Sequence, residues 1–254
     1  MSSLKIIFPD EKKMKLKKLD KIKYALNNIL YSKKIGDAEI EILSECLGKL
    51  QGYLVVADKD NLKEYYEHFR QLDFLSIFNN FIEKNIGKIT FLILEMMSFL
   101  TTNIKNKDIL EYLYKQKFPT NIPGINMSII DKLISLDTKK NEGFLTFQIN
   151  FIKSLTLKMN IETLNYFYDC NINQFPILTK TLSLYNYKDP LIRNVGKAIF
   201  LAIIKIENQN LKEFLVSFPI NLYYSNIIFQ LKNAIVSLSL VDLGDNDGSK
   251  AFNK

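Results

Sequence analysis

The stretch that decides the fold covers residues 143–206 and reads GFLTFQINFIKSLTLKMNIETLNYFYDCNINQFPILTKTLSLYNYKDPLIRNVGKAIFLAIIKI. Its apolar residues recur at the three- and four-residue steps of an α-helix, and short polar breaks separate the runs. We therefore expect three or four apolar helices in close succession. One of them is apolar nearly all round, which indicates a helix with neighbours on both sides: Ile149, Phe151, Ile152, Leu155 and Leu157.

This stretch belongs to a pattern that repeats along the chain. A short polar break is followed each time by a leucine and an aromatic-rich turn, at residues 62–66, 110–114, 164–168 and 211–215. The spacings are 48, 54 and 47 residues, and a longer apolar helix is expected before each of the last three turns, over residues 88–101, 144–159 and 190–206. This period is close to that of armadillo and HEAT arrays. We predict an all-α fold, an armadillo/HEAT-like α-solenoid with degenerate repeats of about 47–54 residues.

Residues suited to helix capping mark where these helices begin. A candidate precedes each aromatic turn: Asp60 or Asn61, Asp108, Asn160, and Asn208 or Asn210. Asp37 is expected to cap a helix that runs to about Ala57, and Asp189 followed by Pro190 marks a further helix start. The clearest break is at residues 117–127, where we expect a surface loop in which Asn126 caps the next helix.

The net charge of +7 is concentrated near the N-terminus. Residues 1–34 contain ten lysines and three acidic residues, so the other 220 residues are neutral overall. Residues 11–31 read as a basic amphipathic helix, because apolar residues recur on one side of it: Leu16, Leu19, Ile22, Leu26, Ile29 and Leu30.

Two interpretations of this basic helix stay open. In one, it is the first helix of the array, with its apolar side inward and its lysines in solvent. In the other, its lysines contact an anionic membrane surface, where each contributes on the order of 1 kcal/mol; the candidates are Lys12, Lys13, Lys15, Lys17, Lys18, Lys21 and Lys23. We divide the chain into residues 1–36, the basic helix packed on or preceding the array, residues 37–241, the helical domain, and residues 242–254, a disordered tail.

The sequence contains no recognisable catalytic or metal-binding constellation. Its single histidine, His68, and its two cysteines, Cys46 and Cys170, are too few for a metal site at ligand spacing. We expect a structural or surface role for the histidine and free thiols for the cysteines. A Gly-rich phosphate loop and a nucleophile elbow are also missing from the sequence, so we predict a protein that is no enzyme and takes no cofactor.

Composition also argues against nucleic-acid binding and against a transmembrane segment. The 13 tyrosines and 18 phenylalanines fall at helical spacing, and the neutral body of the chain lacks a basic stripe. The longest apolar run, residues 89–100, is interrupted by Glu95 and is too short to span a bilayer. The N-terminus shows no signal-peptide pattern.

Two features are candidates for an interaction or structural motif. Arg193 could hold a carboxylate of a partner, but a hydrogen bond from its helix to a loop of the array is the favoured interpretation. In the Phe175-Pro176 dipeptide, proline at a helix start fixes the backbone and seats the phenylalanine against the preceding helix. Packing is favoured over direct partner binding for this dipeptide as well.

The chain resembles the FPL-domain family, the family of C-type lectin domain family 16 member A and the endosomal-maturation proteins. The similar pieces are FLTFQINFIKSLTLKMNIETLNYFYD, then Phe175-Pro176-Ile177 at the place of the Phe-Pro-Leu that gives the family its name, then KDPLIRNVGKAIF. Weaker similarity extends back through KITFLILEMMSFL and the region of residues 69–82 to LDKIKYALNNIL. The resemblance covers roughly residues 19–206, and its motifs are packing motifs.

This resemblance implies a helical, armadillo-like scaffold that binds partner proteins, including ubiquitin-pathway components, in endosome–lysosome traffic, autophagy and mitophagy. It also implies a cytoplasmic protein that is peripheral on endosomal or lysosomal membranes. Family members continue far beyond this domain, so the chain corresponds either to a fragment of a longer member or to a short stand-alone paralogue. The alternative is a structural subunit of a large stable assembly, mitochondrial or cytoskeletal, that reuses the same helical array.

Overall fold

A computed structural model of the chain describes residues 16–120, 122–138, 142–171 and 174–217, and short stretches between residues 224 and 236. The chain forms two compact units, one made of residues 1–169 and 174–177 and the other of residues 170–173 and 178–254. In the described part every named element except one short β-hairpin is a helix, so the all-α prediction is confirmed. Between residues 224 and 236 only short helical pieces are described, and the tail 242–254 lies outside the described residues.

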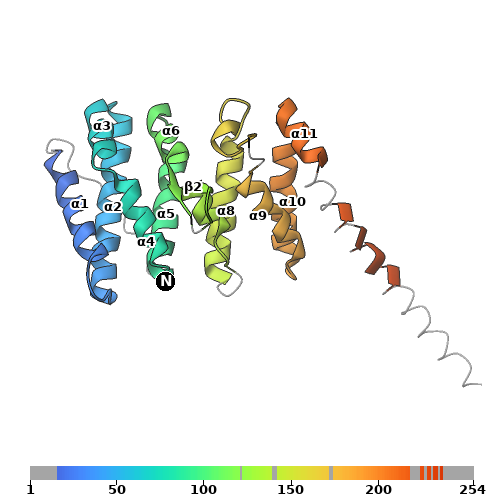
Figure 1. The fold of residues 1–254 in the computed structure, drawn as a ribbon, viewed down its shortest axis with the longest axis horizontal. Helices are drawn as coiled ribbons and strands as arrows, with labels where there is room; N and C mark the ends of the chain where they lie inside the picture. Colours follow the sequence, from blue (N-terminus) through green and yellow to red (C-terminus); the bar gives the residue numbers. More distant parts are fainter. Residues whose placement is uncertain are drawn as a thin grey trace, which may run out of the picture. The chain divides into compact units, whose positions relative to one another are not determined.

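The elements keep the labels of Figure 1. The first unit contains α1 (Lys17–Leu30), α2 (Asp37–Lys59), α3 (Lys63–Gln71), α4 (Phe74–Glu83), α5 (Gly87–Asn103), α6 (Lys107–Lys115), β1 (Lys117–Pro119), β2 (Asn126–Ser128), α7 (Ile129–Ser135), α8 (Glu142–Lys158) and the 3₁₀ turn η2 (Leu164–Tyr166). α9 (Pro176–Ser183) begins in the first unit and continues into the second, which also contains η3 (Leu184–Asn186), α10 (Pro190–Ile204) and α11 (Gln209–Ser217). The three long helices predicted from the repeat are α5, α8 and α10.

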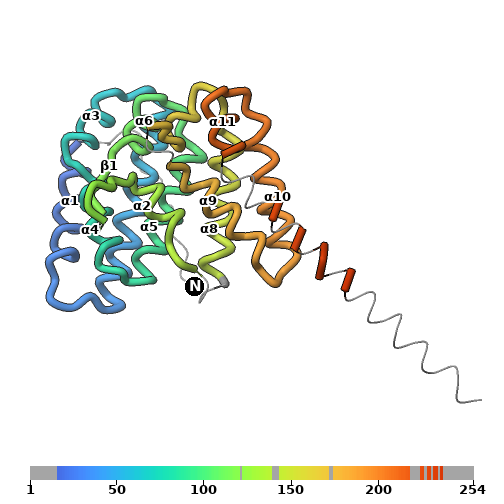
Figure 2. The backbone as a smooth tube through the Cα atoms, turned by 45° about the vertical axis from the view of Figure 1, so that its right-hand side comes forward, coloured from blue at the N-terminus to red at the C-terminus, as the bar shows by residue number. Residues whose placement is uncertain are grey.

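The long helices of the first unit lie in a row in sequence order. α2 packs against α5 and α5 against α8, while α1 packs against α2 and α4 (Figure 1). The shorter α4 and α7 form a second layer, because α4 contacts α5 and α7, and α7 contacts α5 and α8 (Figure 2). A helix inside such a row has neighbours on several sides. This explains why α5 buries residues almost all round: Ile89, Thr90, Leu92, Ile93, Leu94, Met96, Met97, Leu100 and Thr101.

α1, at the start of the row, buries only one face. The buried residues are the ones that the amphipathic pattern selects: Leu19, Ile22, Leu26, Ile29 and Leu30. Full burial of a leucine or isoleucine contributes about 1.5–3 kcal/mol, so this face holds α1 on the array. The inward orientation predicted for the apolar side is therefore confirmed for α1, whereas residues 11–15 of the expected helix lie outside the described residues.

The repeated aromatic turns join one repeat to the next. The ring of Phe69 in α3 meets the ring of Tyr112 in α6 edge-on, with centroids 5.9 Å apart. From the other side of α6, Tyr114 contacts Tyr166 and Phe167 at centroid distances of 5.4 and 4.9 Å. Aromatic pairs at these distances add about 0.5–1.5 kcal/mol to the area they bury. Aromatic rings thus connect α3 to α6, and α6 to the segment of η2.

Polar side chains also cross from one repeat to cap a helix of the next. The carboxylate of Asp58, at the end of α2, accepts hydrogen bonds from the amides of Lys105 and Asn106 at 3.1 and 2.8 Å. These amides lie at the start of α6, where backbone N–H groups lack partners within the helix and a negative charge is favourable. Tyr66 of α3 donates its hydroxyl to the same carboxylate at 3.0 Å.

Two side chains of α8 satisfy backbone carbonyls at the C-terminal ends of the preceding helices. Lys158 donates to the carbonyls of Thr101 and Thr102 in the last turn of α5, at 2.5 and 2.7 Å. Gln148, which is fully buried, donates to the carbonyls of Leu133 and Ile134 at the end of α7, at 2.7 and 3.0 Å. Each contact supplies a donor that the helix end itself cannot provide.

The capping residues predicted from the sequence are partly corrected. Asn160, Asn208 and Asp189 accept backbone hydrogen bonds as expected. Asn106 rather than Asp108 caps α6. The cap positions of α2 and α3 fall at Gly36 and Leu62 instead of Asp37 and Asp60 or Asn61. The backbone amide of Gly36 donates to the side chain of Glu39, the third residue of α2. The carboxylate that caps the start of α2 is therefore that of Glu39 and not that of Asp37.

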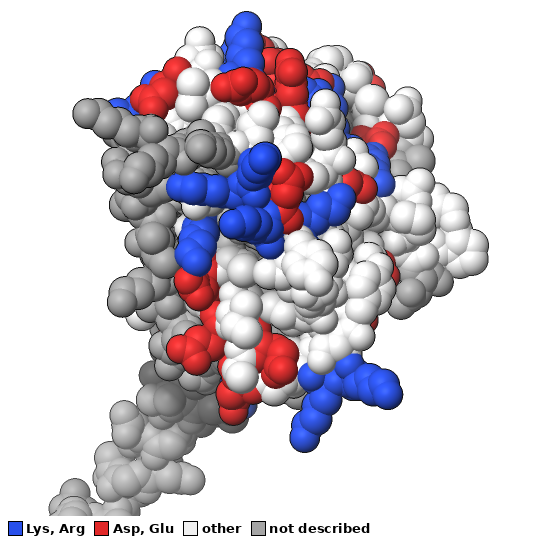
Figure 3. All heavy atoms as spheres, turned by 90° about the vertical axis from the view of Figure 1, so that its left-hand side faces the viewer, with Lys and Arg blue, Asp and Glu red and all other residues white. Residues whose placement is uncertain are grey.

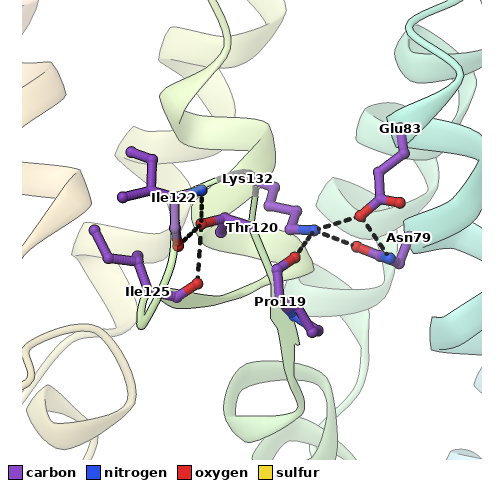
Figure 4. Close-up of polar contacts among 7 residues, drawn as sticks. All are labelled: Asn79, Glu83, Pro119, Thr120, Ile122, Ile125 and Lys132. Carbon is purple, nitrogen blue, oxygen red and sulfur yellow. Dashed lines mark hydrogen bonds and ion pairs between the residues drawn. The ribbon is translucent and has the colours of Figure 1, made fainter.

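The break at residues 117–127, predicted as a loop, contains a β-hairpin. β1 and β2 pair antiparallel with Phe118 opposite Met127, and the cap of the following helix is Ser128 rather than Asn126. Gly124 supplies the positive φ of +80° that the tip requires, and Thr120 ties the tip to Ile125 by hydrogen bonds (Figure 4).

Lys132 of α7 anchors this hairpin to the helical layer. Its ammonium donates to the Asn79 side-chain oxygen at 2.6 Å, to Glu83 at 3.0 Å and to the Pro119 carbonyl at 3.0 Å (Figure 4). The Lys132 side chain is 10% exposed, and the hydrogen bond from it lowers the pKa of Glu83. The Nζ atom of Lys132 in α7 therefore connects α7 to α4 and to β1.

Replacing Lys132 by methionine keeps the length of the side chain and removes its three donated hydrogen bonds. Because Asn79 is buried and loses its donor, we expect Lys132→Met to lower the free energy of unfolding by about 1–3 kcal/mol in urea titrations. Lys88→Met, which breaks an exposed ion pair to Asp37, is the matched control and should cost far less stability, because exposed ion pairs contribute little. Equal losses in the two variants would contradict the anchoring role.

Candidate functional site

The Phe175-Pro176-Ile177 motif lies at the start of α9. Phe175 and Ile177 are buried, with 2% and 0% of their surfaces exposed. The Phe175 ring packs on Tyr168, with centroids 5.6 Å apart, and Pro176 is the first residue of α9. Burial of the two flanking side chains agrees with the packing role favoured from the sequence. Pro176 alone of the three reaches a pocket of the first unit.

This pocket has a volume of about 260 Å³ and lies beside the hairpin. α6, β1 and α7 form one side of it, and the segment from η2 to the start of α9 forms the other. The lining residues are Tyr114, Lys115, Lys117, Asp131, Asn165, Tyr166, Phe167, Tyr168, Asp169, Gln174 and Pro176. Antiparallel backbone hydrogen bonds between Asp169 and Gln174, at 2.9 and 3.1 Å, hold its rim.

Aromatic rings form the walls of the pocket. Tyr114 and Tyr166 stack with an angle of 27° between their planes, and burial raises the pKa of the Tyr114 hydroxyl well above its usual value. The ammonium of Lys115 lies over the Tyr166 ring, 5.2 Å from its centroid. A cation over a tyrosine face at this distance is attracted by the negative face of the ring. One ring of the pocket wall, that of Tyr166, therefore already contacts a positive charge.

Both lysines of the pocket have a carboxylate partner. Lys115 pairs with Glu111 one turn earlier in α6, at 2.5 Å, and Lys117 of β1 pairs with Asp169 at 3.0 Å. These pairs leave one acidic group of the pocket, Asp131, as the carboxylate whose charge is not directly compensated by a described residue.

Asp131 is the third residue of α7 and completes a capping box with Ser128. Its Oδ2 atom accepts hydrogen bonds from the hydroxyl and the amide of Ser128, at 2.8 and 3.3 Å. Burial raises the pKa of Asp131 to about 6, and the hydrogen bonds from Ser128 and the charge of Lys117 only partly oppose that rise. Ionised Asp131 is thus costly in this environment.

The structure places the lysines predicted for membrane contact on or before α1. Lys17 and Lys21 are exposed, Lys18 and Lys23 are partly exposed, and Lys12, Lys13 and Lys15 lie outside the described residues. Figure 3, which faces the side where α1 lies in Figure 1, shows Lys and Arg side chains gathered at the centre of that face. The membrane role of these lysines stays a prediction.

Arg193 and His68 both make contacts inside their own unit. The guanidinium of Arg193 donates to the carbonyls of Tyr187 and Lys188, at 2.8 and 2.6 Å, which is the helix-to-loop hydrogen bond favoured from the sequence. His68 of α3 lies 3.2 Å from the carboxylate of Asp20 in α1, as a structural contact between two helices. Within the described residues no group of His, Cys, Asp and Glu side chains could hold a metal ion.

A family model described as FPL, an uncharacterised conserved protein, matches residues 47–204. The chain belongs to the FPL family. The resemblance inferred from its packing motifs is thereby confirmed, and the match includes the pocket, the Phe175-Pro176-Ile177 segment and all of α10.

Curated relatives of this FPL chain extend well beyond it. The Protein CLEC16A homolog of Drosophila melanogaster is 24% identical over 224 residues, which cover 87% of this chain and 20% of the relative. Human Protein CLEC16A is 22% identical over 223 residues, with coverages of 87% and 20%, and Protein TRANSPARENT TESTA 9 of Arabidopsis thaliana is 18% identical over 229 residues, with coverages of 89% and 26%. The chain thus spans about a fifth to a quarter of their length, and no solved structure matches it.

Sequence reasoning found only one lining residue of the pocket, Pro176. Lys117 and Tyr166 were missed because their segments are about 50 residues apart and meet only when repeats stack. A signal for Asp131 does exist, since Ser128-x-x-Asp131 is the spacing of a capping box. That pattern marks the start of α7, but it does not reveal that the carboxylate lines a cavity.

Asp131→Asn tests the raised pKa. Since the folded-state pKa of about 6 exceeds the usual aspartate value of 3.8, the contribution of Asp131 to stability is present below pH 3.8 and is lost as the pH rises through 6. The stability of the native protein relative to Asp131→Asn should therefore fall by roughly 1–3 kcal/mol between pH 4 and pH 7 in urea titrations.

Asp37→Asn provides a control of opposite sign for this experiment. The hydrogen bond from Lys88 lowers the pKa of Asp37, so the contribution of that carboxylate is lost only as the pH falls below its usual value of 3.8. The stability difference between the native protein and Asp37→Asn should therefore stay nearly constant between about pH 4 and pH 7 and fall only at lower pH. A stability difference between the native protein and Asp131→Asn that stays constant from pH 4 to pH 7 would contradict the assigned shift.

Proposed function

We propose that this FPL chain is a non-enzymatic scaffold, an armadillo-like solenoid whose surfaces hold partner proteins at endosomal or lysosomal membranes. The observation that carries the proposal is the row of α2, α5 and α8, with side chains that cap helix ends across repeats. Stacked repeats of this kind present an extended, rigid surface, which is how repeat proteins bind their partners. The names of these relatives describe no enzyme.

The membrane part of the proposal rests on the exposed side of α1. Lys17 and Lys21 are exposed there, together with the rings of Tyr24 and Tyr31, which are 71% and 78% exposed. Lysines are attracted to anionic headgroups, and tyrosine rings suit the boundary between headgroups and acyl chains. No helix within the described residues is long and apolar enough to cross a bilayer.

Affinity purification of the endogenous, tagged protein at modest salt tests the scaffold. We expect the protein to carry vesicle-tethering or ubiquitin-pathway proteins in substoichiometric amounts when the eluate is sized and identified by mass spectrometry. A single large complex of fixed stoichiometry would overturn the scaffold and support the alternative, a structural subunit of a stable assembly.

Charge reversal on α1 tests the membrane contact. In flotation with vesicles containing phosphatidylserine, the double variant Lys17→Glu, Lys21→Glu should bind about 10- to 100-fold more weakly than the native protein, because each lysine contributes about 1 kcal/mol. Lys84→Glu combined with Lys105→Glu changes the net charge equally at exposed positions outside α1 and is expected to bind like the native protein. Equal loss in both double variants would show that net charge alone decides binding.

A further inference from the structure

The charges of the pocket beside the hairpin are unequally matched. Lys115 and Lys117 each have a carboxylate within 3.0 Å, in Glu111 and Asp169. Asp131 has no lysine, arginine or histidine of the described residues within ion-pairing distance, and its only hydrogen bonds are those with Ser128. The group of the pocket that lacks a counter-charge is therefore a carboxylate, and a ligand that completes the pocket should be a cation.

The hydrogen bonds of Asp131 leave one of its oxygen atoms available. Both bonds from Ser128 reach Oδ2, whereas Oδ1 accepts no hydrogen bond from a described residue. An ionised carboxylate can accept about four hydrogen bonds, so its capacity is only half used. Asp131 lines the cavity, and a donor placed in the cavity could use the remaining capacity.

The walls and the size of the pocket restrict the cation further. Tyr166 already holds one ammonium group over its ring, that of Lys115, so an aromatic face suited to positive charge lies in the same pocket as Asp131. The volume of about 260 Å³ is below the range of roughly 300–1,000 Å³ that is usual for drug-sized ligands. A single long side chain matches this volume better than a cofactor does.

We infer that this pocket binds a basic side chain, arginine or lysine, of a partner protein, with Asp131 as its counter-charge and Tyr166 as an aromatic wall. The inference rests on the proposed scaffold function and adds the chemistry of one contact to it. Asn165 and Gln174 supply amide groups at the rim, which can bond the backbone on either side of the inserted residue.

The test uses the full chain and two capped tripeptides, acetyl-Gly-Arg-Gly-amide and acetyl-Gly-citrulline-Gly-amide. Citrulline has nearly the shape of arginine but no charge, so the pair isolates the contribution of the cation. Binding is followed by the amide NMR shifts of residues 114–117, 131 and 165–169 as peptide is added at low salt. We expect the arginine peptide to bind at least about tenfold more tightly than the citrulline peptide, with shifts confined to these residues.

Variants test whether Asp131 and Tyr166 bind the arginine side chain of the peptide. Asp131→Asn should weaken binding of the arginine peptide about tenfold while keeping an oxygen that accepts from Ser128, and Tyr166→Leu should weaken it severalfold. Asp108→Asn makes the same charge change at an exposed site in α6 and should bind like the native protein. Thermal unfolding of every variant confirms that it is folded under the conditions of the titration.

Several results would overturn the inference. They are equal binding of the two tripeptides, unchanged binding by Asp131→Asn, equal loss in Asp108→Asn, or no shift at millimolar arginine peptide. Tighter binding of spermidine than of the arginine peptide would overturn the assignment to a protein side chain. Any of these results leaves the scaffold function standing if substoichiometric partners still co-purify, so the two failures can be told apart.

Discussion

The first unit depends on hydrogen bonds made to the backbone groups at its helix ends, because packing removes those groups from water. Long helices that stand side by side bring the free N–H and C=O groups of their termini close to neighbouring helices. Asp58 supplies acceptors to the start of α6, Lys158 supplies a donor to the end of α5, and Gln148 supplies donors to the end of α7. Each of these side chains lies on a different helix from the one whose end it satisfies, so these helix ends are completed only by neighbouring helices.

The same dependence explains where the pocket forms. In the first two repeats the aromatic turn is a full helix, α3 or α6, and it fills the end of the repeat. In the third repeat the turn is only the three-residue η2, and the chain leaves it in the non-helical segment before Phe175. A shorter element against α6 and the hairpin leaves unfilled volume, which polar and aromatic side chains line.

The hairpin between α6 and α7 positions several of the residues that line the pocket. The hairpin is inserted between α6 and α7, and Lys132 fixes it against α4 through a nitrogen that serves three acceptors. β1 then positions Lys117 at the pocket, and the junction between β2 and α7 positions Ser128 and Asp131. Function in repeat proteins is usually carried by such insertions, because the helices themselves are committed to packing.

The sequence by itself determined the helical class, the three long apolar helices and the recurring aromatic turns, since apolar periodicity reports which faces are buried. It also determined the amphipathic pattern of α1 and the helix start at Asp189-Pro190. Tertiary structure alone decided which carboxylate caps which helix, that residues 117–128 form a hairpin, and that Lys117, Asp131 and Tyr166 meet in one pocket. Those outcomes depend on contacts between residues that lie far apart in the chain, and local periodicity carries no information about such contacts.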